Sequence, residues 1–166
     1  VLAVDLGSAS GRVLAGTLRD GRLDVTDIHR FKHEARRRDD GTLTWDVATM
    51  EAETITGLKK ALERFPDARA VSIDTWGVDW APLDENGELV GDVIAYRDER
   101  TARTLDAFRE RIGDREFFDL TGNQPATINT ANQLFAYLQE NPADARRVAA
   151  AQIGRASCRE RVCLYV

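Results

Sequence analysis

Cysteine is nearly absent from this sequence of 166 residues, and the two that occur, Cys158 and Cys163, both lie in the last nine positions. Neither has the spacing to other Cys or His residues that a zinc site requires. A disulfide between these two residues would close only a short loop at the end of the chain and could not stabilise the residues before it. Cytosolic chains also rarely carry disulfides. The scarcity of cysteine therefore excludes a disulfide-stabilised scaffold for the rest of the chain.

Long apolar runs and an excess of basic charge are also missing. No stretch approaches the roughly 18 apolar residues that a membrane-spanning helix needs. The formal net charge is −5, which argues against nucleic acid as a partner because binding to its backbone uses clustered Lys and Arg. The chain opens on strand residues and shows no signal peptide. We therefore expect a cytoplasmic protein without a membrane or nucleic-acid partner.

The last stretch, "QIGRASCRERVCLYV" at residues 152–166, differs in composition and pattern from the rest of the chain. It holds three Arg within seven residues and shows no hydrophobic periodicity. Its segment "IGRASCRERV" equals one translation frame of a common sequencing adapter. We expect residues 152–166 to be a non-native tail and residues 1–151 to be the natural, incomplete domain. A natural amphipathic tail with a disulfide is the alternative.

The composition is 43% hydrophobic and 31% charged, which is typical of a soluble domain with a single core. "VLAVDL" at residues 1–6 predicts a central buried strand, and Asp20-Gly21 predicts a hairpin between two further strands. Asp46 is expected to cap a helix that Pro66 ends. The apolar face expected for this helix consists of Val47, Met50, Ile55, Leu58, Leu62 and Phe65.

Strands and helices continue to alternate after this helix. Residues 68–74 predict a second buried strand, and residues 78–83 predict its continuation or its partner. A helix over residues 130–140 is expected to open with a capping box of Thr130 and Gln133. The alternation indicates an α/β fold.

The first motif that carries chemistry is "DLGSASGR" at residues 5–12. A small-residue turn at the end of a strand gathers backbone N–H groups and two hydroxyls around one concavity, which suits a phosphate. Arg12 adds a positive charge, and Asp5 could hold a divalent cation. An ordinary glycine turn is the alternative. The motif lacks the Lys of a P-loop and precedes a strand, so it is neither a P-loop nor a dinucleotide fingerprint.

The second motif is "IDTWGVDW" at residues 73–80, which places two carboxylates, two indoles and a glycine where a parallel strand ends. This combination suits a sugar. Indoles cover the C–H face of a polyol, carboxylates accept hydrogen bonds from its hydroxyls, and a glycine permits close backbone approach. The alternative is a pair of core tryptophans with a capping aspartate.

The third motif, "AYRDERT" at residues 95–101, mixes charges between a strand and a helix. It predicts either a functional segment or a solvated ion-pair cluster in which Thr101 caps the helix. His29 and His33 show no partner spacing, and we expect both at the surface.

In this order, the motifs resemble the amino-terminal lobe of the FGGY family of carbohydrate kinases. The resemblance rests on the "VDLG" strand and its turn ending in Gly11-Arg12, "TWD" at residues 44–46, "IDTWGVD" at residues 73–79 and "AYRD-RT" at residues 95–101. It covers residues 1–151. It implies a truncated ribonuclease H-like α/β lobe of the actin-type ATPases, with a mixed sheet and flanking helices.

The resemblance also implies an activity: transfer of the γ-phosphoryl group of ATP, with Mg²⁺, to the 1-hydroxyl of a ketose. Within the family, "TWGVD" favours L-rhamnulose. The residues implied to face the ATP phosphates are Ser8, Ala9, Ser10, Gly11 and Arg12, although the family's usual order of Ala and Ser in the turn differs. The residue implied to touch the sugar is Gly77, with Trp76, Asp79 and Tyr96 as plausible neighbours.

In this family the catalytic base and the adenine site lie later in the chain, so we expect the 166 residues alone to be inactive. Two rival functions stay open. One is a metal-dependent nuclease of the same fold, with Asp5, Asp74 and Asp79 as metal ligands. The other is a non-catalytic lobe that binds a sugar or a protein partner.

Overall fold

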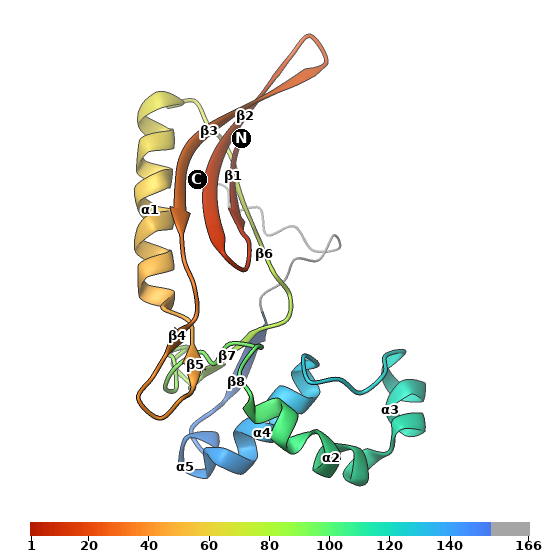
Figure 1. The fold of residues 1–166 in the computed structure, drawn as a ribbon. Coiled ribbons are helices and arrows are strands. Elements are labelled where there is room, and N and C mark those ends of the chain that lie inside the picture. Colours follow the sequence, from red (N-terminus) through yellow and green to blue (C-terminus); the bar gives the residue numbers. More distant parts are fainter. Residues whose placement is uncertain (154–166) are drawn as a thin grey trace. The chain divides into compact units, whose positions relative to one another are not determined.

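The computed structural model describes residues 1–153 (Figure 1). The expectations about Cys158, Cys163 and the residues around them lie outside this range. Within it, no helix combines the length and the apolar character needed to cross a membrane.

The described residues form two compact units. The first unit comprises residues 1–34 and 46–77, and the second comprises residues 35–45 and 78–153. The chain therefore leaves the first unit after Glu34, returns to it at Asp46 for a helix and a strand, and leaves it again after Gly77.

The first unit is built on a four-stranded sheet in the order β3-β2-β1-β6. β1 pairs antiparallel with β2 and parallel with β6, so the expected mixed sheet is confirmed. Asp20 and Gly21 have φ angles of 49° and 76° and form the predicted tight turn between β2 and β3. The strands are β1 (Leu2–Leu6), β2 (Ser10–Arg19), β3 (Arg22–Lys32) and β6 (Val71–Thr75).

β6 differs from the expected second buried strand. Ile73, in its middle, is 49% exposed, and β6 pairs with β1 along one side and with no other described strand. β1 is the interior strand that its sequence predicts, with Leu2 and Val4 buried in the core. The sequence pattern thus identified the strand at residues 68–74 correctly but not its position at the edge.

Helix α1 (Val47–Arg64) packs against this sheet, and Asp46 caps it as predicted by accepting a hydrogen bond from the backbone N–H of Thr49 at 2.9 Å. The expected apolar face is partly wrong, since Ile55 and Leu62 are 43% and 44% exposed. The buried positions of the helix are Thr54, Gly57 and Ala61.

Small residues on this face let the helix approach the sheet closely. A Cβ atom on Gly57 would overlap with the side chain of Val13. Ala61 is fully buried in the same core as Leu2 and Val13. The close approach of α1 to the sheet therefore favours burial of the face with small residues, and the larger side chain of Ile55 is partly exposed to solvent.

The second unit combines helices with short strand pairs. Its aromatic core includes Phe108, whose ring packs edge-on against Phe117 at 5.5 Å and Phe135 at 5.7 Å. The helices are α2 (Arg100–Ile112), α3 (Asp114–Thr121), α4 (Thr130–Glu140) and α5 (Pro142–Ala145). The strands are β4 (Arg36–Arg37), β5 (Leu43–Thr44), β7 (Trp80–Leu83) and β8 (Ala150–Ile153).

β7 is neither a continuation nor a partner of β6, because it pairs antiparallel with β8. Gln152 and Ile153 take part in this pairing, opposite Ala81 and Trp80. Strand pairing therefore continues two residues past the predicted natural boundary at residue 151. That boundary remains a prediction.

The predicted capping box of α4 is wrong. The N-cap residue is Asn129, and Thr130 is the first residue of the helix. The Gln133 side chain is fully buried and donates to the carbonyl oxygens of Val78 and Ile128, both at 3.0 Å. Since its amide satisfies buried carbonyl groups, it does not close the helix start.

Replacing Gly57 with Ala tests the close approach of α1. Alanine is the better helix former, yet the added methyl group must displace Val13, and we expect a loss of about 1 to 3 kcal/mol of unfolding free energy. Thr56→Ala, at an exposed position of the same helix, should be neutral or slightly stabilising. Urea unfolding followed by circular dichroism measures both. A Gly57→Ala protein as stable as the parent would contradict this account of the packing.

Candidate functional site

The turn between β1 and β2 closes in the way its sequence predicts. β1 ends at Leu6, and the backbone N–H of Gly7 donates to the carbonyl oxygen of Ser10 at 2.9 Å. The parallel register sets Leu6 opposite Thr75, so β1 and β6 end on the same side of the sheet (Figure 1). The turn follows β1 there, and Trp76 follows β6. In α/β sheets this carboxyl edge is where ligands bind.

Arg12 and Asp5 form an ion pair across β1 and β2. The Arg12 Nε and Nη2 atoms lie 2.7 and 2.6 Å from Asp5 Oδ2, because the two residues are direct partners in the strand register. Their side chains are 42% and 39% exposed. The predicted phosphate cation and the predicted metal ligand are therefore neighbours beside the turn.

Gly11 is required by packing as well as by any ligand. A Cβ atom at this position would overlap with the ring of Phe31, which is buried on β3. The ring lies directly against the start of β2, so no side chain fits between them. This contact ties the predicted phosphate turn to β3.

His33 is a residue of this edge that the sequence did not reveal. The expectation of a surface position is wrong for His33, whose residue exposure is only 9%. Its ring stacks on the indole of Trp76 with the centroids 5.6 Å apart and the planes at 21°. Its backbone N–H also donates to the carbonyl oxygen of Ala9 at 3.3 Å. Only the spatial proximity of three segments reveals this position.

The surroundings of His33 change its protonation. Burial lowers the pKa of His33, while the backbone carbonyl groups of Gly7 and Ser10 act in the opposite direction and are outweighed. The neutral imidazole is therefore favoured in the folded protein. His29, by contrast, contacts helix α1 through Glu53 at 2.6 Å and Lys60 at 3.2 Å.

Asp79 lies in the second unit and is 6% exposed. Its Oδ2 atom accepts a hydrogen bond of 2.7 Å from Nε1 of Trp45. The "TWD" and "TWGVD" motifs are thus joined by a buried contact between their own side chains. Trp80 is buried and packs edge-on against Tyr137 at 5.1 Å, so it fits the core alternative.

Tyr96, also in the second unit, is half-buried. Its hydroxyl accepts a hydrogen bond of 2.8 Å from Nε of Arg97, and the Arg97 guanidinium lies 5.1 Å from the centre of the Tyr96 ring. Of the predicted site residues, the structure therefore brings together Asp5, the turn from Ser8 to Arg12, Trp76 and Gly77 within the first unit. Asp79 and Tyr96 belong to the second unit.

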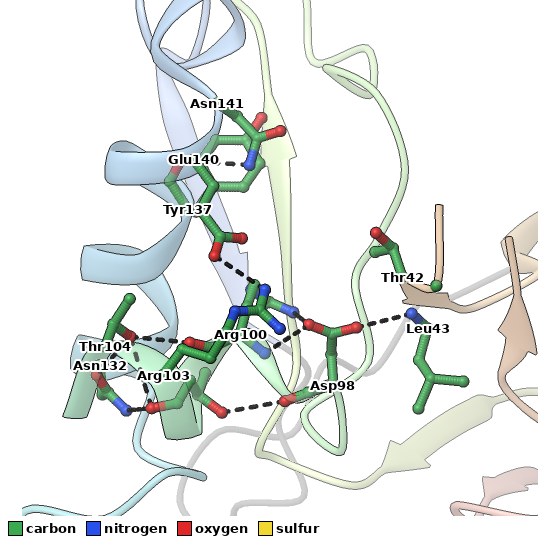
Figure 2. A network of polar contacts seen from close by, with 12 residues as sticks. Thr42, Leu43, Asp98, Arg100, Arg103, Thr104, Asn132, Tyr137, Glu140 and Asn141 are labelled. Atoms are coloured by element: carbon green, nitrogen blue, oxygen red, sulfur yellow. Dashed lines mark hydrogen bonds and ion pairs between the residues drawn. The ribbon is translucent and has the colours of Figure 1, made fainter. Parts of the chain in front are cut away.

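The "AYRDERT" segment forms a buried polar network rather than a solvated ion-pair cluster (Figure 2). Asp98 accepts hydrogen bonds from the backbone N–H groups of Leu43 at 2.8 Å and Arg100 at 2.9 Å. Its carboxylate also lies 3.5 Å from the Arg100 guanidinium. Both side chains are almost fully buried, and burial lowers the pKa of Arg100.

Asp98 therefore provides at the start of α2 the capping contact that Thr101 was expected to make. The Thr101 hydroxyl instead donates to the carbonyl oxygen of Asp98, and the Thr101 carbonyl accepts from Asn132 on α4 at 2.9 Å. The network joins β5, α2 and α4 into one structure.

The carboxylates offer a limited set of metal ligands. Within residues 1–153, no group of three or more His, Cys, Asp or Glu side chains lies close enough to hold a metal ion. Asp5 and Asp74 are direct partners in the register of β1 and β6. One or two carboxylates suit Mg²⁺ that is otherwise held by substrate phosphates and water. The third ligand expected for the two-metal nuclease, Asp79, belongs to the second unit and accepts a hydrogen bond from Trp45.

Comparison with known proteins identifies the family. Residues 1–157 match the N-terminal domain of the FGGY family of carbohydrate kinases, and the chain belongs to that family. It is 39% identical over 145 residues to a rhamnulokinase from Mannheimia succiniciproducens, covering 86% of this chain and 30% of that protein. It is 38% identical over 133 residues to a rhamnulokinase from Bacillus subtilis, covering 80% of this chain and 27% of that protein. The chain thus spans less than a third of these curated relatives.

Solved structures agree on the fold. The xylulose kinase from Rhodospirillum rubrum matches with a TM-score of 0.78 at 18% identity, over 93% of this chain and 32% of that one. Plasmodium falciparum glycerol kinase with ADP matches with a TM-score of 0.73 at 16% identity, over 93% and 32%. The predicted actin-type ATPase lobe is confirmed as the fold of the described residues.

His33 predicts a pH dependence of stability. Since its pKa is lowered in the folded state, the unfolded chain, with a His pKa near 6.5, binds the proton more readily. The resulting destabilisation is absent well above pH 6.5 and grows as the pH falls through 6.5 towards the folded pKa. Melting temperatures at pH 7.5 and 5.5 should therefore fall further for the parent than for His33→Asn. Equal falls in both proteins would refute the buried, neutral state of His33.

Proposed function

We propose that the full-length protein is a kinase that transfers the γ-phosphoryl group of ATP to the 1-hydroxyl of L-rhamnulose. The observation that carries this proposal is the similarity to rhamnulokinases, at 36–39% identity in the relatives compared, over most of this chain. Xylulose and glycerol kinases of known structure with the same fold are only 10–18% identical to it. This difference supports rhamnulose over xylulose or glycerol.

The turn from Ser8 to Arg12 is the proposed site for the ATP phosphates. Its support is geometric, since the turn lies at the carboxyl edge of the sheet with a cation beside it. Arg12 is held beside the turn by Asp5, so it would lose little side-chain freedom on binding a phosphate. Charge-assisted hydrogen bonds of this kind are stronger than neutral ones.

Gly77 is the proposed point of closest contact with the ketose. It is exposed in the bend after β6, next to an indole whose orientation is fixed by stacking on His33. An indole face held in place can cover the C–H face of a sugar at small entropic cost. Asp79 and Tyr96 remain proposed neighbours of the sugar.

Mg²⁺ fits the carboxylate of Asp5, with Asp74 beside it on β6. When bound, the ion would neutralise phosphate charge as the phosphoryl group is transferred. We propose that the catalytic base and the adenine site belong to the remainder of the full-length enzyme, so the 166 residues alone would not catalyse transfer. Alignment of acceptor, base and phosphate lowers such barriers by roughly 7 to 11 kcal/mol, and one wall of the site cannot supply it.

Gly77→Val tests the sugar site in the full-length enzyme. The isopropyl group would occupy space that the ketose needs, and we expect the KM for L-rhamnulose to rise about tenfold or more while the KM for ATP changes less than about twofold. Ser72→Val adds similar bulk at an exposed position of β6 and should change neither constant. Equal increases in the KM values for L-rhamnulose and ATP would contradict the assignment of Gly77 to the sugar site.

Arg12→Ala tests the phosphate site. Loss of the guanidinium should weaken nucleotide binding by about 1.5 to 3 kcal/mol and leave sugar affinity nearly unchanged. Arg30→Ala is a matched control, because Arg30 is paired with Arg12 in the strand register and forms its own ion pair with Asp27. Isothermal titration with ADP and, separately, with sugar measures both affinities. A fall in sugar affinity alone would show that the two sites are reversed.

A further inference from the structure

His33 lies where three segments that are distant in sequence meet at one edge of the first unit. The turn between β1 and β2 supplies Gly7, Ala9 and Ser10, the end of β3 leads into the histidine itself, and the segment after β6 supplies Trp76. The ring of His33 is buried and stacked on the indole. This residue therefore contacts the proposed phosphate turn through its backbone N–H and the proposed sugar segment through its ring.

The surroundings of the ring fix its position. Phe31, two residues earlier on β3, lies 6.0 Å from it at an interplanar angle of 43°. The same Phe31 ring closes over Gly11 at the other end of the turn. Phe31 and His33 thus contact the turn at two points, at Gly11 through the Phe31 ring and at Ala9 through the backbone N–H of His33.

A phosphate cradle works only if its N–H groups point at the ligand, so its affinity depends on the backbone conformation of the turn. The backbone N–H of His33 donates to the carbonyl oxygen of Ala9, in the middle of the turn, at 3.3 Å. Groups held by neighbours in this way are preorganised, and loss of the support weakens binding without removing any ligand contact. The stacking on Trp76 also supports the ring.

We propose that His33 is a positioning residue that holds the phosphate turn in its binding conformation and braces it against Trp76, so that the nucleotide and sugar segments depend on each other through this ring. The inference rests on the proposed function of the turn. It assigns His33 no contact with substrate and no proton transfer. Disturbing the stack from the sugar side should therefore weaken nucleotide binding even when no sugar is present.

The test uses the full-length enzyme and ADP titrations without sugar. His33→Phe keeps a ring to stack on Trp76 but removes the two ring nitrogens on which the carbonyl groups of Gly7 and Ser10 act, and we expect the dissociation constant for ADP to rise about tenfold. His33→Asn and His33→Gln each place an amide N–H near one ring nitrogen, and at least one of them should restore affinity to within about threefold of the parent. His29→Phe is the matched control, because His29 lies on the same strand but contacts α1. Its affinity should stay within about twofold.

The second arm replaces Trp76. Trp76→Leu should raise the ADP dissociation constant about threefold through loss of the stack, and its combination with His33→Phe should be less than additive. Unchanged ADP affinity in His33→Phe, or additive effects in the double variant, would overturn the proposal.

Because Arg12→Ala reports on the phosphate site itself, its failure to weaken ADP binding would instead overturn the proposed function of the turn. An error in the proposed sugar would leave these titrations unaffected.

Discussion

The parallel pairing of β1 with β6 is the constraint on which the site of the first unit depends. It sets Asp5 opposite Asp74 and Leu6 opposite Thr75, although about 70 residues separate the strands in sequence. The same register places the glycine turn and Trp76 at one edge. A slip by one residue would move every side chain of β6 to the other face of the sheet, and with it the carboxylate beside Asp5.

Close packing at two glycines holds β2 against its neighbours. Gly57 lets α1 settle on Val13 in the middle of β2, and Gly11 lets Phe31 close over the start of the same strand. Both glycines serve packing density, since protein interiors leave no room for an additional carbon. The position of β3 follows from these contacts, and the position of His33, just beyond its end, follows from β3.

Local patterns were enough to predict much of the fold. The hairpin at Asp20, the cap at Asp46 and the interior position of β1 each follow from a few adjacent residues. The buried position of His33 and the buried Arg100 do not, because each depends on partners brought together only by the tertiary fold. Hydrophobic periodicity also predicted the wrong buried face for part of α1. Its close approach to the sheet buries the small residues Gly57 and Ala61, whereas Ile55 and Leu62 are exposed. The motif resemblance identified the family, which the comparison confirms, and the roles of individual site residues remain predictions.

The bond between the Asp98 carboxylate and the backbone of Leu43 has a consequence for synthesis on the ribosome. Residues 35–45 belong to the second unit, although both stretches that flank them in sequence belong to the first. Their partner Asp98 is made 55 residues later, which corresponds to roughly 3 to 11 seconds of elongation at about 5 to 20 residues per second. Until then β5 emerges without the carboxylate that holds its backbone. The residues of the first unit are therefore synthesised, and can begin to fold, before β5 can form its hydrogen bond with Asp98.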